Sequence, residues 1–342
     1  MKISRYLPKS NNLALTKSTN RSFSKKLGIL LAIFALGIIQ LSPSRLLAGD
    51  EVESFFPKDN DVFIHINIDA LLASDLCKDY AMTMIKDALG KKEVKDITSM
   101  LGIDPLKDLN HIYMVAPFDP TNSDPKGTIL LKGNFDVNKI NGSLEKIAKK
   151  DETFTVQKIG DKSGFKIMVP NSPVPLYGAL LDSKYLILAS DKNIVADGFA
   201  AASGTKKSVL NPKLLALVKK LDPKAAFSFT GYLTGKLDKL PIPTGDATKD
   251  LDKIESLTLE FSLEKGAKLS GNLVTTDSKV AKNYHEQVSS LFQAAPLLLG
   301  SNPAMKPVIE VLKKSAPKLE DKTIFLNFEI SNSQIKSIIG KE

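Results

Sequence analysis

Residues Phe56–Tyr80, FPKDNDVFIHINIDALLASDLCKDY, predict a strand followed by a helix. Between Asp61 and Asp69, branched apolar residues occupy every second position, so one face of the expected strand is apolar and the other is more polar. Ser74 is expected to cap the helix that follows. The apolar stripe of that helix has helical spacing and consists of Cys77, Ala81, Met84, Ile85 and Ala88.

The rest of the chain repeats this combination of strands and helices. The clearest strand is predicted at 254–263, where apolar and polar residues alternate as in an antiparallel sheet with one packed face. A long helical region is predicted at 277–314, and a terminal strand begins near Ile324. We therefore predict an α+β fold, with mainly antiparallel sheets and helices packed on one face.

Weak internal similarity suggests two related halves, which we place at 49–205 and 206–342. At a constant offset of 160 residues, four positions of the first half recur in the second: Lys158, Asp161, Lys162 and Phe165 match Lys318, Asp321, Lys322 and Phe325. Both halves also contain a helix expected to begin after an aspartate, at Asp136 and Asp277. Chance similarity between two strand–helix–strand units is the alternative.

Residues 1–48 have the pattern of a secretory signal peptide. Residues 1–26 are basic and contain no acid, 27–41 form an apolar run, and 42–48 are a short polar exit. The apolar run has 15 residues, which is short for a membrane-spanning helix. We expect cleavage after Ala48 and an exported, periplasmic or extracellular protein. An uncleaved N-terminal anchor is the alternative, and it would be the chain's only membrane contact.

The basic character of the chain is concentrated in this leader. The chain has 47 Lys and Arg residues and 38 Asp and Glu residues. Eight of the basic residues lie in 1–48, which leaves 39 basic residues against 38 acidic ones. Nucleic-acid binding requires an excess of cations, so we expect no nucleic-acid partner.

The sequence contains no recognisable catalytic, cofactor or metal motif. The three histidines, His65, His111 and His285, are far apart and have no metal-ligand spacing. Cys77 is the only cysteine, so no intrachain disulfide can form, and its place on an apolar stripe favours a buried, unreactive thiol. We therefore predict no enzyme activity, no cofactor and no metal. A hydrolase assembled from Ser or Asp residues of distant loops is the alternative.

One apolar segment is a candidate lid over a hydrophobic groove. It is interrupted by a proline, which is expected to bend or end a helix. Its residues are Leu291, Phe292, Pro296, Leu297, Leu298 and Leu299. A bent helical hairpin that merely covers a sheet is the simpler interpretation.

Several segments resemble a family of uncharacterised exported bacterial proteins. They are Phe56–Val62, Ile68–Ser74 (IDALLAS), Leu101–Leu109 (LGIDPLKDL), Lys132–Asp136 (KGNFD) and a terminal strand running through Ile339. The resemblance implies a signal peptide, an α+β fold and two similar halves. It implies no catalytic residues.

These observations favour an exported, non-catalytic protein of the cell envelope with a structural or binding role, whose partner is another envelope protein or an apolar ligand. The alternative is a periplasmic carrier that holds an apolar ligand or lipid in a groove between sheet and helices.

Overall fold

A computed structural model describes residues 52–91, 95, 98–99, 101–119, 126–168, 172, 174–206, 210–239, 250–299 and 306–339. The predicted leader, 1–48, lies outside these residues. Within the described part of the chain, no helix is both long and apolar enough to cross a membrane.

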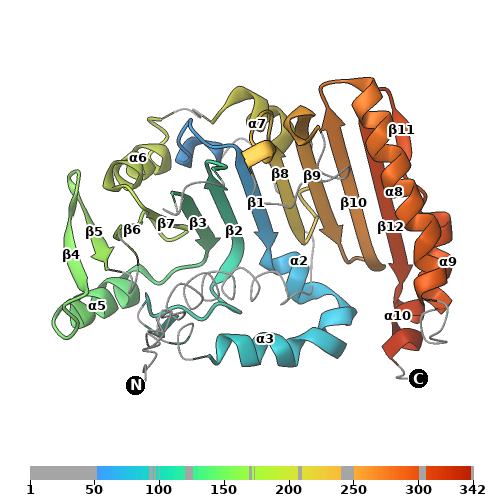
Figure 1. The fold of residues 1–342 in the computed structure, drawn as a ribbon. Coiled ribbons are helices and arrows are strands. Elements are labelled where there is room, and N and C mark those ends of the chain that lie inside the picture. Colours follow the sequence, from blue (N-terminus) through green and yellow to red (C-terminus); the bar gives the residue numbers. More distant parts are fainter. Residues whose placement is uncertain are drawn as a thin grey trace, which may run out of the picture.

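The described strands form one 12-stranded sheet in which every neighbouring pair is antiparallel (Figure 1). Its order is β11-β12-β10-β9-β8-β1-β2-β3-β7-β6-β5-β4. The strands are β1 (Val62–Asn67), β2 (Leu109–Ala116), β3 (Thr128–Gly133), β4 (Phe154–Ile159), β5 (Lys162–Ile167), β6 (Leu176–Leu180), β7 (Tyr185–Ala189), β8 (Phe227–Tyr232), β9 (Ile254–Ser262), β10 (Gly266–Thr275), β11 (Lys318–Glu320) and β12 (Thr323–Ser331). Helices pack on this sheet, so the predicted α+β class is confirmed.

In the opening stretch, the strand is shorter than predicted and an additional short helix precedes the helix predicted after Ser74. β1 ends at Asn67, whose side chain accepts a hydrogen bond of 2.9 Å from the Ala70 amide and so caps α2 (Ile68–Ala73). The strand expected to reach Asp69 is therefore two residues too long. Ser74 follows α2, and its Oγ accepts a hydrogen bond from the Leu76 amide at 3.1 Å. A π-helical turn, η2 (Cys77–Ala81), and α3 (Met82–Leu89) complete the unit.

From β8 to β4 in the order of the sheet, helices cover both faces. On one face, α2, α3 and α5 (Val137–Ala148) pack on a core that contains Ile66, Ile112 and Leu186. On the other, the 3-10 turn η1 (Glu53–Phe55), α6 (Lys192–Ala202) and α7 (Pro212–Val218) pack on a core that contains Phe63 and Ile187. The α5 helix begins as predicted, because Asp136 Oδ1 accepts a hydrogen bond from the Lys139 amide.

The helices that follow β10 pack against the strands at one end of the sheet. α8 (Ser278–Leu299) packs against β10, β11 and β12, and α9 (Lys306–Lys314) packs against β12 and α10 (Asn332–Ile339). The expectation of a terminal strand through Ile339 is wrong, because the strand ends at Ser331. Gln334 Oε1 accepts hydrogen bonds from the Ser331 amide and hydroxyl, both at 2.9 Å, and these start α10.

The two halves meet at β1 and β8, the first strands of each, which lie side by side at the centre of the sheet (Figure 1). Each half continues as a three-stranded meander, β1-β2-β3 or β8-β9-β10. The 160-residue offset matches β12 to β5, but β12 lies beside β10 as β7 lies beside β3. The topological counterpart of β12 is therefore β7. The boundary at 205/206 stays a prediction.

Candidate functional site

One face of the sheet is apolar across both halves. Residues paired across antiparallel strands point to the same side. One such row runs through Met114, Ile64, Phe229, Leu259, Gly271 and Leu326, and the next through Ile112, Ile66, Phe227, Phe261, Leu269 and Phe328. We call this side the apolar face. On the opposite side, β8 and β9 carry polar residues, among them Thr230 and Thr258, whose hydroxyls are 2.8 Å apart.

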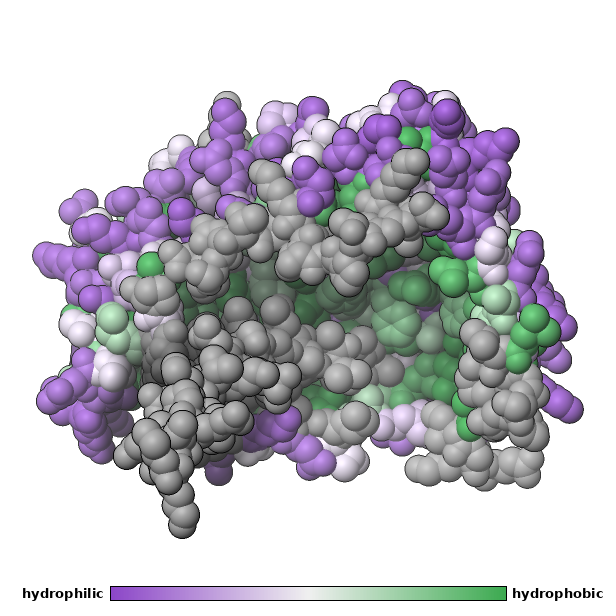
Figure 2. Space-filling model, in the orientation of Figure 1, coloured by the Kyte–Doolittle hydropathy of each residue, from purple (hydrophilic) through white to green (hydrophobic). Residues whose placement is uncertain are grey.

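Part of the apolar face is not packed against the hydrophobic cores. Six of its side chains are only partly buried or exposed, and they belong to none of the core clusters formed by the described residues. We call them the groove floor: Phe229, Leu257, Leu259, Leu269, Leu326 and Phe328. Leu269 is 41% exposed. Figure 2 shows hydrophobic residues lining a hollow over β9 and β10, on the side of α8 that faces β1.

The N-terminal half of α8 forms one wall of this groove. Val280 and Tyr284, four residues apart, pack against Ile254 and Ile324, and Leu273 of β10 packs against the same cluster. Leu273 is the cross-strand partner of Leu257 on the groove floor. The helix wall and the apolar floor are therefore continuous.

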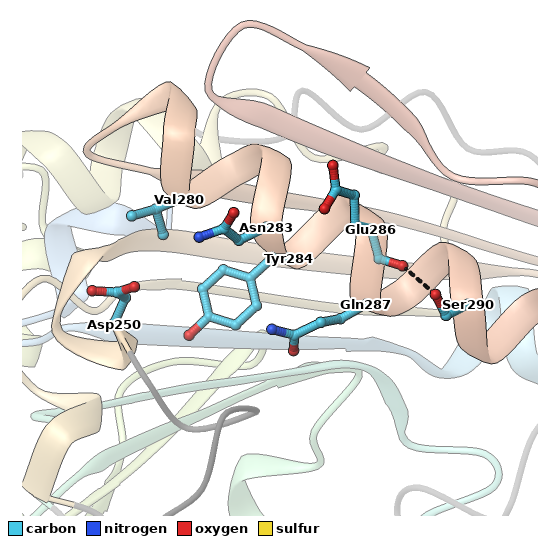
Figure 3. Close-up of a pocket in the computed structure, with 7 residues that line it drawn as sticks. All are labelled: Asp250, Val280, Asn283, Tyr284, Glu286, Gln287 and Ser290. Atoms are coloured by element: carbon cyan, nitrogen blue, oxygen red, sulfur yellow. Dashed lines mark hydrogen bonds between the residues drawn. The ribbon is translucent and has the colours of Figure 1, made fainter.

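A cavity of about 340 Å³ lies at this end of the groove. Its lining residues are Asp250, Val280, Asn283, Tyr284, Glu286, Gln287 and Ser290. Gln287 lies four residues after Asn283 and three after Tyr284, and the three side chains extend from the same side of α8, toward the side on which Asp250 lies (Figure 3). The carboxylate of Glu286 points away from them, and its main-chain carbonyl accepts a hydrogen bond of 2.8 Å from Ser290 Oγ. The groove thus has a polar end and an apolar floor.

The electrostatic environment at the polar end is negative. Burial, followed by the charges of Asp250 and Asp252, raises the pKa of Tyr284 above its ordinary value. Asp250 is held by an ion pair of 2.8 Å with Lys253, and its backbone adopts the left-handed conformation with φ of 66°. No lysine lines the cavity among the residues that the structure describes.

The predicted lid belongs to the C-terminal half of α8. Leu291 is 68% exposed and Leu297 is 85% exposed, whereas Phe292 and Pro296 are partly buried. The helix continues through Pro296 to Leu299, so the proline does not end it. The side chains of Leu298 and Leu299 lie outside the described part of the structure. Whether these six residues act as a lid stays a prediction.

Two of the three histidines meet, which sequence spacing did not indicate. His65 Nε2 and His111 Nδ1 are 3.1 Å apart on the neighbouring strands β1 and β2, and His65 stacks on Tyr113 with ring centroids 4.7 Å apart. Burial is the main cause that lowers the pKa of His65 to about 3 and that of His111 to about 4, and the nearby Lys132 lowers both further. Both rings are more than nine-tenths buried, so they are not positioned to meet a substrate.

The remaining candidate groups do not join this pair. His285 lies on α8, where Nε2 is 3.1 Å from the Pro317 carbonyl. Cys77 is buried, which raises the pKa of its thiol to about 12 and makes the reactive thiolate inaccessible near neutral pH. No group of three or more metal-ligating side chains gathers within the described ranges.

Comparison with known proteins adds little to this geometry. No protein-family description matches the chain, and no curated protein matches it. One solved structure is similar over most of its length, that described as "Structure of crystal form I of TP0453". Its TM-score is 0.44 at 9% sequence identity, and the match covers 86% of this chain and 98% of that chain. This degree of similarity is too low to support a functional argument.

Proposed function

We propose that this is an exported, non-catalytic binding protein of the cell envelope that carries an apolar or amphiphilic ligand in the groove between the apolar face and α8. The single observation that carries the proposal is the groove floor. It consists of six apolar side chains on one face of the sheet that belong to no hydrophobic core formed by the described residues. Soluble proteins rarely leave contiguous apolar surface of this kind without a use.

The shape of the groove favours a small ligand over a broad protein interface. The cavity at its polar end, about 340 Å³, falls within the range of about 300–1,000 Å³ that is usual for small-molecule sites. An apolar floor with a few converging polar groups is also the usual composition of such sites. Export is proposed from the leader at 1–48, and the non-catalytic role agrees with the deep burial of the histidine pair.

The first test is binding of N-phenyl-1-naphthylamine, a neutral apolar dye that fluoresces when it leaves water. We expect the mature protein to bind it and Leu269→Asn to bind it about tenfold more weakly, because an amide in the floor loses apolar contact and is desolvated by the ligand. The matched control is Met168→Asn, since Met168 is exposed to nearly the same extent, 40% against 41%, but follows β5, away from the groove. Equal weakening by both variants, or none by Leu269→Asn, would contradict the proposal.

A second copy of the chain is the competing occupant of the groove. Light scattering of the purified protein separates the two cases. We expect a monomer whose mass does not depend on Leu269. A dimer that dissociates in Leu269→Asn would assign the apolar floor to self-association and would remove the carrier function.

A further inference from the structure

The ligand's polar end is constrained by the chemistry of the cavity at the end of the groove. This inference rests on the proposed carrier function and specifies its ligand. The cavity offers two side-chain amides, Asn283 and Gln287, the phenol of Tyr284 and the carboxylate of Asp250. These groups supply both hydrogen-bond donors and acceptors, one negative charge and no positive charge.

The position of the cavity makes it the end of the groove and not a separate site. Tyr284 contributes both to the cavity wall and to the cluster with Ile324 and Leu273, and Leu273 pairs with Leu257 on the floor. A molecule whose apolar chain lies on the floor therefore has its other end beside Asn283, Tyr284 and Gln287. Leu269 lies further along the same floor, one strand-pair row beyond Leu259 and Gly271.

Charge decides which head groups are compatible with this end. Asp250 is the carboxylate that faces the three side chains of α8, whereas that of Glu286 points away from them (Figure 3). Lys253 offsets part of the Asp250 charge through their 2.8 Å ion pair. Burial is the main cause that raises the pKa of Tyr284, and the charges of Asp250 and Asp252 raise it further. An anionic head brought here would meet like charge in a partly desolvated site, where repulsion is stronger than in bulk water.

We propose that the groove binds a single-chain amphiphile whose head group donates hydrogen bonds and carries no negative charge, with the head between Asp250 and the Asn283–Gln287 side of α8. Hydroxyl and ammonium heads share this chemistry. A carboxylate, sulfate or phosphate head does not.

The test is competition against N-phenyl-1-naphthylamine by three ligands with the same 12-carbon chain at pH 7.5. They are 1-monolauroylglycerol (neutral), dodecylamine (cationic) and laurate (anionic). We expect the neutral and cationic ligands to displace the dye and laurate to compete about tenfold less well. Comparable dissociation constants for laurate and 1-monolauroylglycerol would overturn the inference.

Two variants beside the cavity and one control variant separate charge from other causes. Asp250→Asn should reduce the discrimination against laurate to about twofold or less, because it removes the repelling carboxylate while asparagine tolerates the left-handed backbone. Lys253→Gln removes the offsetting cation and should widen the discrimination. Glu310→Gln is the control and should leave it unchanged, since Glu310 is an exposed carboxylate on α9 and does not line the cavity. Discrimination that persists in Asp250→Asn would overturn the inference.

Failure of this inference is distinguishable from failure of the carrier function. If all three ligands displace the dye equally, and Leu269→Asn still weakens dye binding, the carrier function stands and the head-group selectivity is wrong. If none of the ligands displaces the dye, and Leu269→Asn binds it as the wild type does, both proposals fail.

Discussion

Lowering the pH from 7.5 to 5.0 is expected to reduce the free energy of unfolding by about 4 kcal/mol through the His65–His111 pair alone, about 2 kcal/mol from each ring. Both folded-state pKa values lie well below the ordinary 6.5, at about 3 and about 4. The folded protein therefore keeps both rings neutral while the unfolded chain binds protons. Stability that is present above pH 6.5 is lost as the pH falls toward 4.

The physical cause is the position of the two rings. His65 and His111 lie on the side of β1 and β2 opposite the apolar face, stacked near Tyr113 and next to the Lys132 ammonium. A proton on either ring would place a charge in a buried site that already faces a cation. No carboxylate is among the groups that shift the two pKa values.

Urea unfolding of the wild type and of a His65→Gln/His111→Asn double variant, at both pH values, measures this effect. The amides retain hydrogen-bonding groups near the two facing nitrogens but do not titrate. Both proteins have the same carboxyl groups. Taking the difference between the two proteins therefore cancels the contribution of these groups to the pH dependence of the free energy of unfolding. We expect the wild type to lose about 4 kcal/mol more than the double variant. Equal pH dependence of the two proteins would show that the pair does not stay neutral in the folded state.

Two glycine-to-alanine substitutions should have opposite effects on stability. A Cβ at Gly133, the last residue of β3, would lie 1.8 Å from the Asp108 carbonyl oxygen. Because this oxygen belongs to the main chain, it can move away only at a large cost in free energy. We expect Gly133→Ala to lower the free energy of unfolding by about 3 kcal/mol or more, because the start of β2 must move away. Gly142 lies within α5 and has open space around its Cβ position, so Gly142→Ala should raise stability by about 0.5–1 kcal/mol.

Chemical denaturation of both glycine variants, with the m-value monitored, tests these two predictions. An unchanged m-value would confirm that the midpoint reports stability and not a change in the unfolded state. If Gly133→Ala were neutral, the close approach of β2 and β3 at this position would be wrong. If Gly142→Ala were destabilising, the assignment of that residue to an open helix surface would be wrong.

The sequence predicted the elements well where periodicity and capping agree. Asp136 caps α5 as expected. Alternation identified β9, because one side of it faces the groove and the other is polar. The errors fall where a polar side chain overrides an apolar pattern. Asn67 starts a helix inside an alternating run, and Gln334 starts one where a strand was expected to continue.

The candidate site was less predictable, for two reasons. Residues of distant strands meet only through the sheet order, so neither the His65–His111 contact nor the rows of the apolar face follow from sequence spacing. On α8, the spacing of Val280, Asn283, Tyr284 and Gln287 marks one side of a helix, but polar residues on such a side usually face water. Only the position of Asp250 opposite them defines a cavity.

Native mass spectrometry of the mature protein after incubation with 1-monolauroylglycerol tests the central claim most directly. The account predicts one retained molecule per chain, and its loss in Leu269→Asn but not in Met168→Asn. A bare polypeptide mass for the wild type, or retention that does not depend on Leu269, would contradict the claim that the groove floor is part of a ligand site.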